Sequence, residues 1–392
     1  MDVKEYAQKY SDYVISMRRH FHRHPEPSLE EFETCKRIVE ELQEMGLEPR
    51  VVHTTGVTVD IGDAARSGKT VMLRADIDAL RIVEETGEEF ASENHGIMHA
   101  CGHDSHAAML LTAAHILKDM EDAGEINGRV RLIFEPAEEI AKGANGMIAA
   151  GVMDGVDIVY GTHVWSTVDA GIFSVSPGPV MASADFFTIT VRGKAVHGSA
   201  PEAGIDPIAT AAAIVTELYN VFNREYPSSE TVVLSLCQIS GGNTDNAIPE
   251  IVTMGGTTRA FNEDIRQSFP GTIERVIKGV AAAHRAEADL DYRWGSPVCV
   301  NDEGAVKRAE KSIASIFGEE AVQGFDPVMG GENFGEYEKL VPGVFVFLGV
   351  RNEECGAVYP QHSNRYRMDE SALIKGAAAA VQFAVDYLNE EE

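Results

Sequence analysis

Residues 98–106 read Met-His-Ala-Cys-Gly-His-Asp-Ser-His, and the apolar run 107–117 follows them directly. Five of these nine residues carry a thiol, imidazole or carboxylate group, the side-chain groups that divalent transition metals take as ligands. Gly102 separates Cys101 from His103, and glycine allows backbone angles that would strain another residue. A histidine-rich helix start with a core cysteine is the simpler alternative. The density of ligand groups favours a metal site at the start of a buried helix.

Four short runs with strand character surround this stretch, at 57–61, 70–74, 129–134 and 157–160. Helical stretches separate several of them, which is typical of an α/β domain with a mostly parallel central sheet. Acidic residues or histidine follow three of the runs: Asp76 and Asp78, then Glu135, Glu138 and Glu139, then His163. Because sites in open α/β sheets gather at the carboxyl ends of strands, we expect these residues to converge.

The character of the sequence changes near residue 180. Strand patterns at 185–192, 231–239, 251–259 and 288–293 alternate with helices from Asp206-Pro207 and over 265–284. This β-α-β-β-α-β order is the split βαβ, ferredoxin-like arrangement. We predict that residues 182–293 form an inserted α+β domain, and that residues 1–181 and 294–392 form the α/β domain.

The region before the cysteine cluster has helical character. Residues 3–22 show amphipathic spacing, and Ser28 with Glu31 has the form of a capping box before a second helix. Three histidines lie within 20–24, and we expect them on a helix surface rather than in a metal site, because no carboxylate cluster is near.

Composition limits the partners and the compartment. The chain has 392 residues, which favours two domains, and a formal charge of −29, which argues against nucleic acid or an anionic membrane as partner. Five scattered cysteines imply no disulfide framework and fit a reducing compartment. We find no signal-peptide pattern and no apolar run of about 18 residues. The expectation is a cytoplasmic protein.

The motif Glu-Pro-Ala-Glu-Glu at 135–139 follows an apolar strand. Adjacent carboxylates repel one another, and exposed pairs usually belong to a solvated surface. A cation resolves the repulsion when one carboxylate binds it and the other stays free, because a nearby glutamate can then take a proton from water acidified by the cation. His163 and His362, taken alone, are as consistent with core or loop positions as with ligands.

Six stretches together resemble the M20 metallopeptidase family, in its branch of N-acyl-amino-acid amidohydrolases. That branch includes hippurate, indole-acetyl-amino-acid and aminobenzoyl-glutamate hydrolases. The stretches run in the family's order and span most of the chain: RADIDAL at 74–80, HACGHD at 99–104, EPAEE at 135–139, GTH at 161–163, GKAVHGSAP at 193–201 and GTTR at 256–259.

The resemblance implies two divalent metal ions in the larger domain, zinc or manganese, with cobalt as a further alternative. The implied ligands are Cys101 bridging both ions, His103 and His163 on one ion, and Glu139 and His362 on the other. Glu138 would be the general base, and Asp78 would orient a ligand without touching the metal.

The resemblance also implies that the inserted domain acts as a lid and as the surface of a homodimer. His197 would reach the active site of the partner subunit and stabilise the oxyanion, and Asn246 and Arg259 would hold the substrate carboxylate. Without the motifs, His197 would be a turn histidine and Arg259 a surface arginine at a strand end.

The predicted function is hydrolysis of a small N-acyl-amino acid to a carboxylic acid and an amino acid. A dipeptidase or carboxypeptidase acting on dipeptide-like substrates stays open, as does a non-catalytic module that holds metal. The sequence departs from the family pattern at Arg81, Asn333 and Asn364, where proline, aspartate and proline are usual. None of these positions is an implied ligand, so they bear on substrate preference more than on activity.

Overall fold

The computed structural model describes residues 2–390, and the chain forms two compact units. The first unit contains the residues up to Val180, the segment Val300–Asp326 and the chain from Asn333 onward. The second unit contains Met181–Cys299 and the short segment Pro327–Glu332. Residues 327–332 lie outside the predicted insert of residues 182–293. Their sequence has no helix or strand pattern that would link them to it.

An eight-stranded sheet forms the centre of the first unit, in the order β1-β2-β4-β3-β5-β16-β6-β15. Its strands are β1 (Arg50–Val52), β2 (Gly56–Gly62), β3 (Thr70–Asp76), β4 (Arg129–Glu135), β5 (Ile158–Asp169), β6 (Phe173–Ser174), β15 (Val322–Gln323) and β16 (Gly343–Arg351). The central pairs β4/β3, β3/β5 and β5/β16 are parallel, and their residues are almost all buried. The prediction of a mostly parallel central sheet is confirmed.

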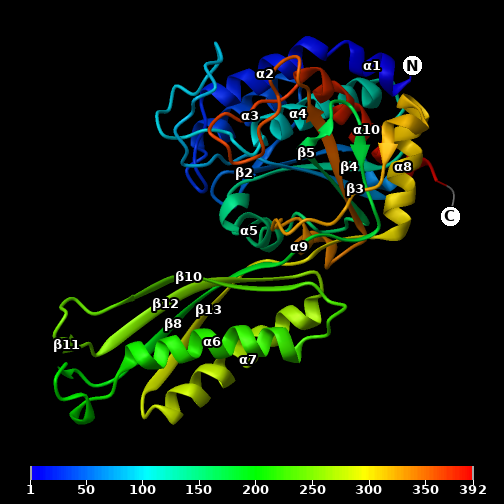
Figure 1. Cartoon of the computed structure of the whole chain (residues 1–392). Helices are drawn as coiled ribbons and strands as arrows, with labels where there is room; N and C mark the ends of the chain where they lie inside the picture. The colour runs from blue at the N-terminus through cyan, green and yellow to red at the C-terminus, as the bar shows by residue number, and fades with distance from the viewer. Residues whose placement is uncertain (1, 391–392) are drawn as a thin grey trace. The chain divides into compact units, whose positions relative to one another are not determined.

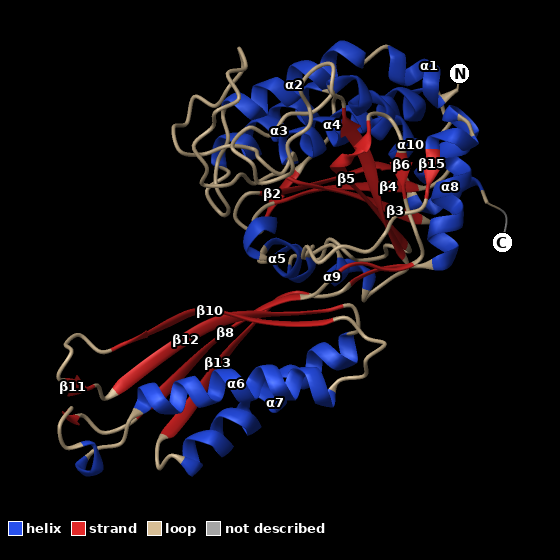
Figure 2. Ribbon diagram, viewed as in Figure 1, coloured by secondary structure: helices blue, strands red, loops and turns tan. Residues whose placement is uncertain are grey.

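Helices cover both faces of this sheet, and Figure 1 and Figure 2 show α4 and α10 on one face with α5 and α9 on the other. The helices are α1 (Val3–Gln8), α2 (Ser11–Arg23), α3 (Phe32–Glu44), α4 (His103–Asp122), α5 (Gly143–Ala149), α8 (Glu303–Phe317), α9 (Gly335–Glu338) and α10 (Leu373–Asn389). A parallel sheet covered on both faces explains why its strands are continuous apolar runs rather than alternating ones.

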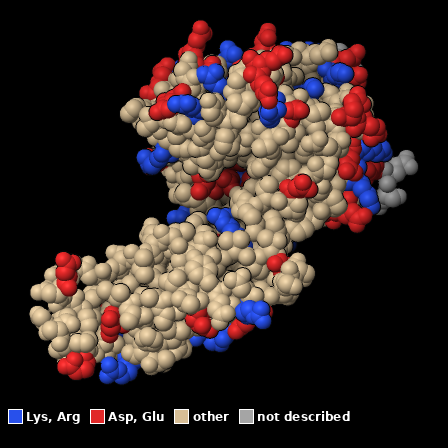
Figure 3. Space-filling model, viewed as in Figure 1, with Lys and Arg blue, Asp and Glu red and all other residues tan. Residues whose placement is uncertain are grey.

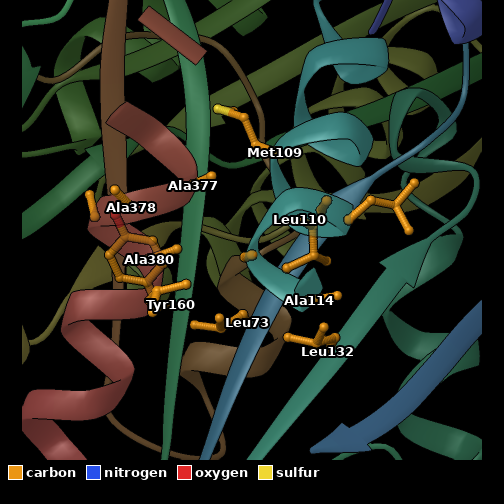
Figure 4. Close-up of a cluster of buried hydrophobic side chains, with 14 of the residues drawn as sticks. Leu73, Met109, Leu110, Ala114, Leu132, Tyr160, Ala377, Ala378 and Ala380 are labelled. Atoms are coloured by element: carbon orange, nitrogen blue, oxygen red, sulfur yellow. The ribbon is translucent and has the colours of Figure 1, made fainter. Parts of the chain in front are cut away.

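Helix α4 lies between the sheet and other helices, and most of its side chains are buried. Figure 4 shows Leu110 of α4 in one apolar cluster with Leu73 of β3 and Tyr160 of β5. Helix α10 approaches α4 closely at Gly376, where a Cβ atom would lie 2.3 Å from Met109 Sδ. A helix surrounded by protein needs no polar face, which accounts for the unbroken apolar run after the cysteine cluster.

The N-terminal region differs from two sequence predictions. Residues 3–22 form the two helices α1 and α2 rather than one. The predicted capping box is wrong, because Ser28 Oγ donates to Asp78 Oδ2 at 2.6 Å and Glu31 accepts from the backbone N–H of Ala137 at 2.9 Å. Glu26 instead accepts from the first amides of α3, including that of Thr34 at 2.8 Å. Both predicted capping residues are thus taken by partners distant in sequence.

The second unit has a four-stranded antiparallel sheet in the order β10-β12-β8-β13. Its elements are β8 (Ala184–Arg192), α6 (Pro207–Glu225), β10 (Val232–Gly241), β12 (Ile251–Ala260), α7 (Glu263–Ala283) and β13 (Glu287–Ser296). The predicted β-α-β-β-α-β order is therefore present. Asp206 accepts hydrogen bonds from the backbone N–H groups of Ile208 and Ala209, so it caps α6 as its sequence position indicates. A short ribbon of this unit pairs β9 (Val196–His197) with β11 (Ala247–Ile248), whereas β7 (Gly178–Met181) pairs with β14 (Cys299–Asn301) where the chain passes between the two units.

No helix within residues 2–390 is long and apolar enough to cross a membrane. In that same part of the chain, all five cysteines lie outside disulfide bonds. On the face that Figure 3 shows, acidic side chains are spread among the basic ones without a continuous basic patch. This distribution agrees with the net charge of −29.

Candidate metal centre

The five candidate ligands come from separate segments of the first unit. They are Cys101 and His103 at the start of α4, Glu139 just after β4, His163 in β5 and His362 in the loop that follows β16. Gly102, with φ at 98°, has the left-handed backbone conformation that brings its two neighbours to one side. His362 also has a left-handed φ of 65°, and its backbone N–H donates to the Ala100 carbonyl at 2.8 Å. That bond ties the histidine loop to the cysteine loop.

Two groups of ligand atoms form around Cys101. One contains Cys101, His103 and His163, the other contains Cys101, Glu139 and His362, and within each group all atoms lie within 4.8 Å of one another. Cys101 Sγ lies 3.4 Å from His163 Nε2, and Glu139 Oε1 lies 3.6 Å from His362 Nε2. The structure therefore brings together all five residues in the two sets that the resemblance implied, with the thiol common to both.

Hydrogen bonds orient the two histidines of the first group. His103 Nδ1 donates to Asp78 Oδ1 at 3.2 Å, and His163 Nδ1 donates to the Val164 carbonyl at 2.6 Å. Nε2 of each imidazole is therefore the nitrogen that would bind a metal ion. A carboxylate or carbonyl behind a ligating histidine fixes its tautomer and makes it a better ligand.

The donor set fits a divalent transition metal. His103 Nε2 and Glu139 Oε1 are buried and have no hydrogen-bond partner among the described residues. Buried polar atoms without partners cost free energy, which a bound cation would remove. Thiolate, imidazole and carboxylate together suit zinc and the neighbouring transition metals.

Asp78 holds the loop that carries the two glutamates. Its carboxylate accepts from the backbone N–H of Glu138 at 3.2 Å and from that of Glu139 at 3.1 Å. Ser28 and His103 donate to the same carboxylate. One buried side chain therefore positions both a candidate ligand and the candidate base.

Burial and neighbouring charges shift the protonation of the site. Burial, together with Glu139, raises the pKa of the Cys101 thiol, and burial raises the pKa of Glu139 to about 7 despite the nearby His103. Burial and the neighbouring His106 hold the pKa of His163 well below its ordinary value. His163 is therefore neutral, while the thiol and the glutamate favour their protonated forms until a cation enters. Cation binding would release these protons.

A third group, Asp76, His103 and His106, also has ligand atoms within 4.8 Å. His106 Nδ1 donates to Asp76 Oδ1 at 2.5 Å, and His106 Nε2 accepts from the backbone N–H of Val164 at 2.9 Å. Both nitrogens of this imidazole are occupied, and Arg74 holds the other oxygen of Asp76 at 2.6 Å. We therefore interpret this group as a hydrogen-bonded support behind His103 rather than as a metal site.

A family model described as peptidase family M20/M25/M40 matches residues 72–386. The chain belongs to this family. An N-acyl-L-amino acid amidohydrolase of Geobacillus stearothermophilus is 41% identical, over 80% of this chain and 85% of its own. Thermostable carboxypeptidase 1 of Saccharolobus solfataricus is 38% identical, over 99% of this chain and 98% of its own. The crystal structure of YxeP from Bacillus subtilis, a dinuclear metal binding peptidase of the M20 family, has a TM-score of 0.84 and 35% identity, covering 97% of this chain and 99% of YxeP.

Two of the predicted substrate residues of this M20 hydrolase lie together in its second unit. His197 in β9 pairs with Ala247 in β11, and the Asn246 carbonyl accepts from the backbone N–H of Gly198 at 2.8 Å. His197 is exposed, and its Nδ1 lies 2.8 Å from Ser199 Oγ.

Arg259 lies near the opposite end of β12 from this ribbon. Residues 251 and 259 of β12 are separated by roughly 26 Å along the strand, at a rise of about 3.3 Å per residue. The guanidinium group of Arg259 is half-buried and makes no hydrogen bond or ion pair with any residue between 2 and 390. Burial lowers its pKa. The charge of Asp185 acts on Arg259 and opposes this shift, but no ion pair joins the two among the described residues, so the guanidinium is available for an anionic ligand.

Several residues around the M20 site were not assigned by sequence reasoning. The prediction of surface positions for the three N-terminal histidines is wrong for His22, which is buried with Nδ1 2.7 Å from Asp104 Oδ2 and Nε2 3.2 Å from Glu84 Oε1. Arg18 pairs with the same Asp104 at 2.9 Å. These partners are about sixty or more residues apart, so no local pattern could reveal them. The one available signal in the sequence was Arg18, an arginine among the apolar residues of a helix, because such a residue needs an acidic partner when the helix is buried.

Proposed function

We propose that the protein is a metal-dependent amidohydrolase that cleaves N-acyl-amino acids to a carboxylic acid and an amino acid. The observation that carries the proposal is the thiol of Cys101 shared between two sets of ligand atoms, with the carboxylate of Glu138 beside them. Glu138 is buried, and one of its carboxylate oxygens lies within 4.8 Å of ligand atoms of His103 and Glu139. The relative from Geobacillus, named for N-acyl-L-amino acids, supports this substrate class.

We propose that two divalent ions, zinc or manganese with cobalt as an alternative, are held by the five residues Cys101, His103, Glu139, His163 and His362. When bound, such ions lower the pKa of water and polarise a carbonyl group. The thiolate and the Glu139 carboxylate would offset part of the positive charge.

The residues of this chain would then carry the protons and hold the substrate. Glu138 takes a proton from the attacking water as the water oxygen bonds to the acyl carbon. It returns that proton to the amine nitrogen as the carbon–nitrogen bond breaks, which yields the acid and the free amino acid. His197 would stabilise the oxyanion, and Arg259 with Asn246 would bind the α-carboxylate.

We propose that the protein is a cytoplasmic homodimer that pairs through the second unit. His197 lies in the ribbon beside one end of the second unit's sheet and Arg259 lies near the other end, so a single copy of that unit does not present both to the same small substrate. A second copy supplying both His197 and Asn246 resolves this separation. The absence of disulfides among the described residues fits a reducing compartment.

The first test is Glu138→Ala, assayed with N-acetyl-, N-benzoyl- and indole-3-acetyl-amino acids in added zinc or manganese. We expect turnover to fall by at least about 10³-fold, because proton transfer loses its base, while metal content by mass spectrometry stays unchanged. Retained turnover would refute the assignment of Glu138. Metal-loaded wild type without turnover on the whole panel would favour the non-catalytic alternative.

A carboxypeptidase or dipeptidase is the second candidate, because thermostable carboxypeptidase 1 matches nearly the whole chain. The two activities differ in the group on the amine side of the scissile bond. Comparing kcat/KM for N-acetyl-L-alanyl and L-alanyl derivatives of the same amino acid distinguishes them. Higher values for the free-amine dipeptide would replace the main proposal.

A further inference from the structure

Asn333 is the first residue of the first unit after the chain leaves the segment Pro327–Glu332. Its side chain is 1% exposed, and it directly precedes the short helix α9. In the sequence, this residue stands out only as a departure from the family pattern. Its contacts show that it lies between the candidate base and a buried ion cluster.

The backbone N–H of Asn333 donates to Glu138 Oε1 at 3.2 Å. On the other side, Asn333 Oδ1 accepts from Arg74 Nη2 at 2.8 Å. One residue thus connects the carboxylate of the base to an arginine of β3.

Arg74 is itself rigidly held. Its guanidinium pairs with Asp76 at 2.6 Å and with Glu135 at 2.8 Å, and Tyr337 donates to Glu135 at 3.0 Å. The Arg74 side chain is 1% exposed, and both carboxylates are fully buried. Hydrogen bonds to charged groups in such surroundings are strong and geometrically defined.

This arrangement constrains the base. A glutamate side chain has three rotatable bonds, and a general base must stay within about 3 Å of the proton it takes. The bond from the peptide N–H of residue 333 to Oε1 therefore limits the orientations that the Glu138 carboxylate can take. The Asn333 carbonyl also accepts from the Glu336 N–H at 2.9 Å, and the Arg74–Asn333 bond fixes the side-chain end of the residue, so the two together hold this peptide in place.

We propose that Asn333 is a positioning residue, which transmits the rigidity of the Arg74 cluster to the carboxylate of Glu138. This inference rests on the proposed role of Glu138 as base. It concerns an interaction made outside the metal ligands, so metal binding and substrate binding should be independent of it.

The test compares the kinetics of three variants with those of the wild type. The substrate is the acyl-amino acid that the wild type turns over fastest. Asn333→Ala removes the acceptor for Arg74, and we expect kcat to fall about 10- to 100-fold because the base is no longer fixed. KM and metal stoichiometry should stay near wild type. Asn333→Asp keeps an oxygen for Arg74 and should retain kcat within about threefold.

Asn301→Ala is the matched control. Asn301 is also a buried asparagine of the first unit, and it bonds to the backbone of Ser176 and Phe345 instead of to Arg74 or Glu138. We expect Asn301→Ala to lower the melting temperature at least as much as Asn333→Ala does. The kcat of the protein that stays folded should be unchanged.

Three results would overturn the proposal. These are an unchanged kcat in Asn333→Ala, an equal loss of kcat in Asn301→Ala, or a loss of bound metal in Asn333→Ala. An active Glu138→Ala variant would instead refute the assigned base, so failure of this inference is distinguishable from failure of the proposed function.

Discussion

At the scale of single residues, the site contains groups whose ionisation destabilises the metal-free fold. Glu139 is a ligand candidate that faces Cys101 and His362, yet burial raises its pKa to about 7. A carboxyl group with a raised pKa binds its proton more tightly in the folded protein than in the unfolded chain. The metal-free fold therefore loses stability as pH rises from the ordinary pKa of about 4.5 towards 7.

We predict that Glu139→Gln makes the metal-free protein more stable than wild type at pH 8, by on the order of 2 kcal/mol, and not at pH 4. The amide cannot ionise, so the penalty for a buried charge disappears. Urea unfolding in a chelator at both pH values measures the difference. Glu40→Gln, at an exposed position of α3, controls for the loss of one charge. A variant that is less stable than wild type at pH 8 would contradict the prediction.

At the scale of elements, the start of α4 decides where the ligands point. Gly102 precedes His103, the first residue of the helix, and a Cβ atom at Gly102 would lie 2.4 Å from Val164 Cγ2. β5, which carries Val164, therefore passes so close to the helix start that only glycine fits between them. The same contact brings His163 of β5 next to Cys101.

We predict that Gly102→Ala lowers both the melting temperature and the bound metal, because β5 or the cysteine loop must move. Gly68→Ala is the control, since Gly68 also has a left-handed φ of 77° but nothing within 4 Å of its added Cβ. The control should cost about 1 kcal/mol of stability from backbone strain alone and leave metal content unchanged. Equal metal content in the two variants would show that the close contact does not matter.

At the scale of the whole molecule, the proposed active site needs two chains. His197 and Asn246 belong to a ribbon beside one end of the second unit's sheet, and Arg259 belongs to the other end. Their separation within one copy is much larger than an N-acyl-amino acid. We therefore predict that the proposed homodimer is required for activity.

We predict that two inactive variants, Glu138→Ala and His197→Ala, restore activity when they are unfolded and refolded together. A mixed dimer holds one site with an intact Glu138 from one chain and an intact His197 from the other. Random pairing should recover about a quarter of wild-type turnover, since half of the dimers are mixed and each has one intact site of two. Each variant refolded alone is the control. For His197→Ala alone, we expect turnover to fall about 10²–10³-fold. No recovery, or a fully active monomer in light scattering, would exclude catalysis across subunits.

The sequence by itself determined the alternation of strands and helices, the ferredoxin-like order of the second unit, and which residue types carry the chemistry. Periodic apolar patterns, the Asp206 cap and the apolar run after residue 106 are local signals, so each can be recognised without the fold. The motifs identified the five ligand candidates, although their convergence was an inference from strand ends.

Only the tertiary structure decided which polar residues support these groups. Ser28 contacts Asp78 instead of capping a helix, His22 is buried against Asp104, and Arg74 reaches Asn333 across 259 positions of sequence. Such partners are chosen by burial, because a polar group removed from water must bond to whatever the packed chain places beside it. No local pattern encodes that choice.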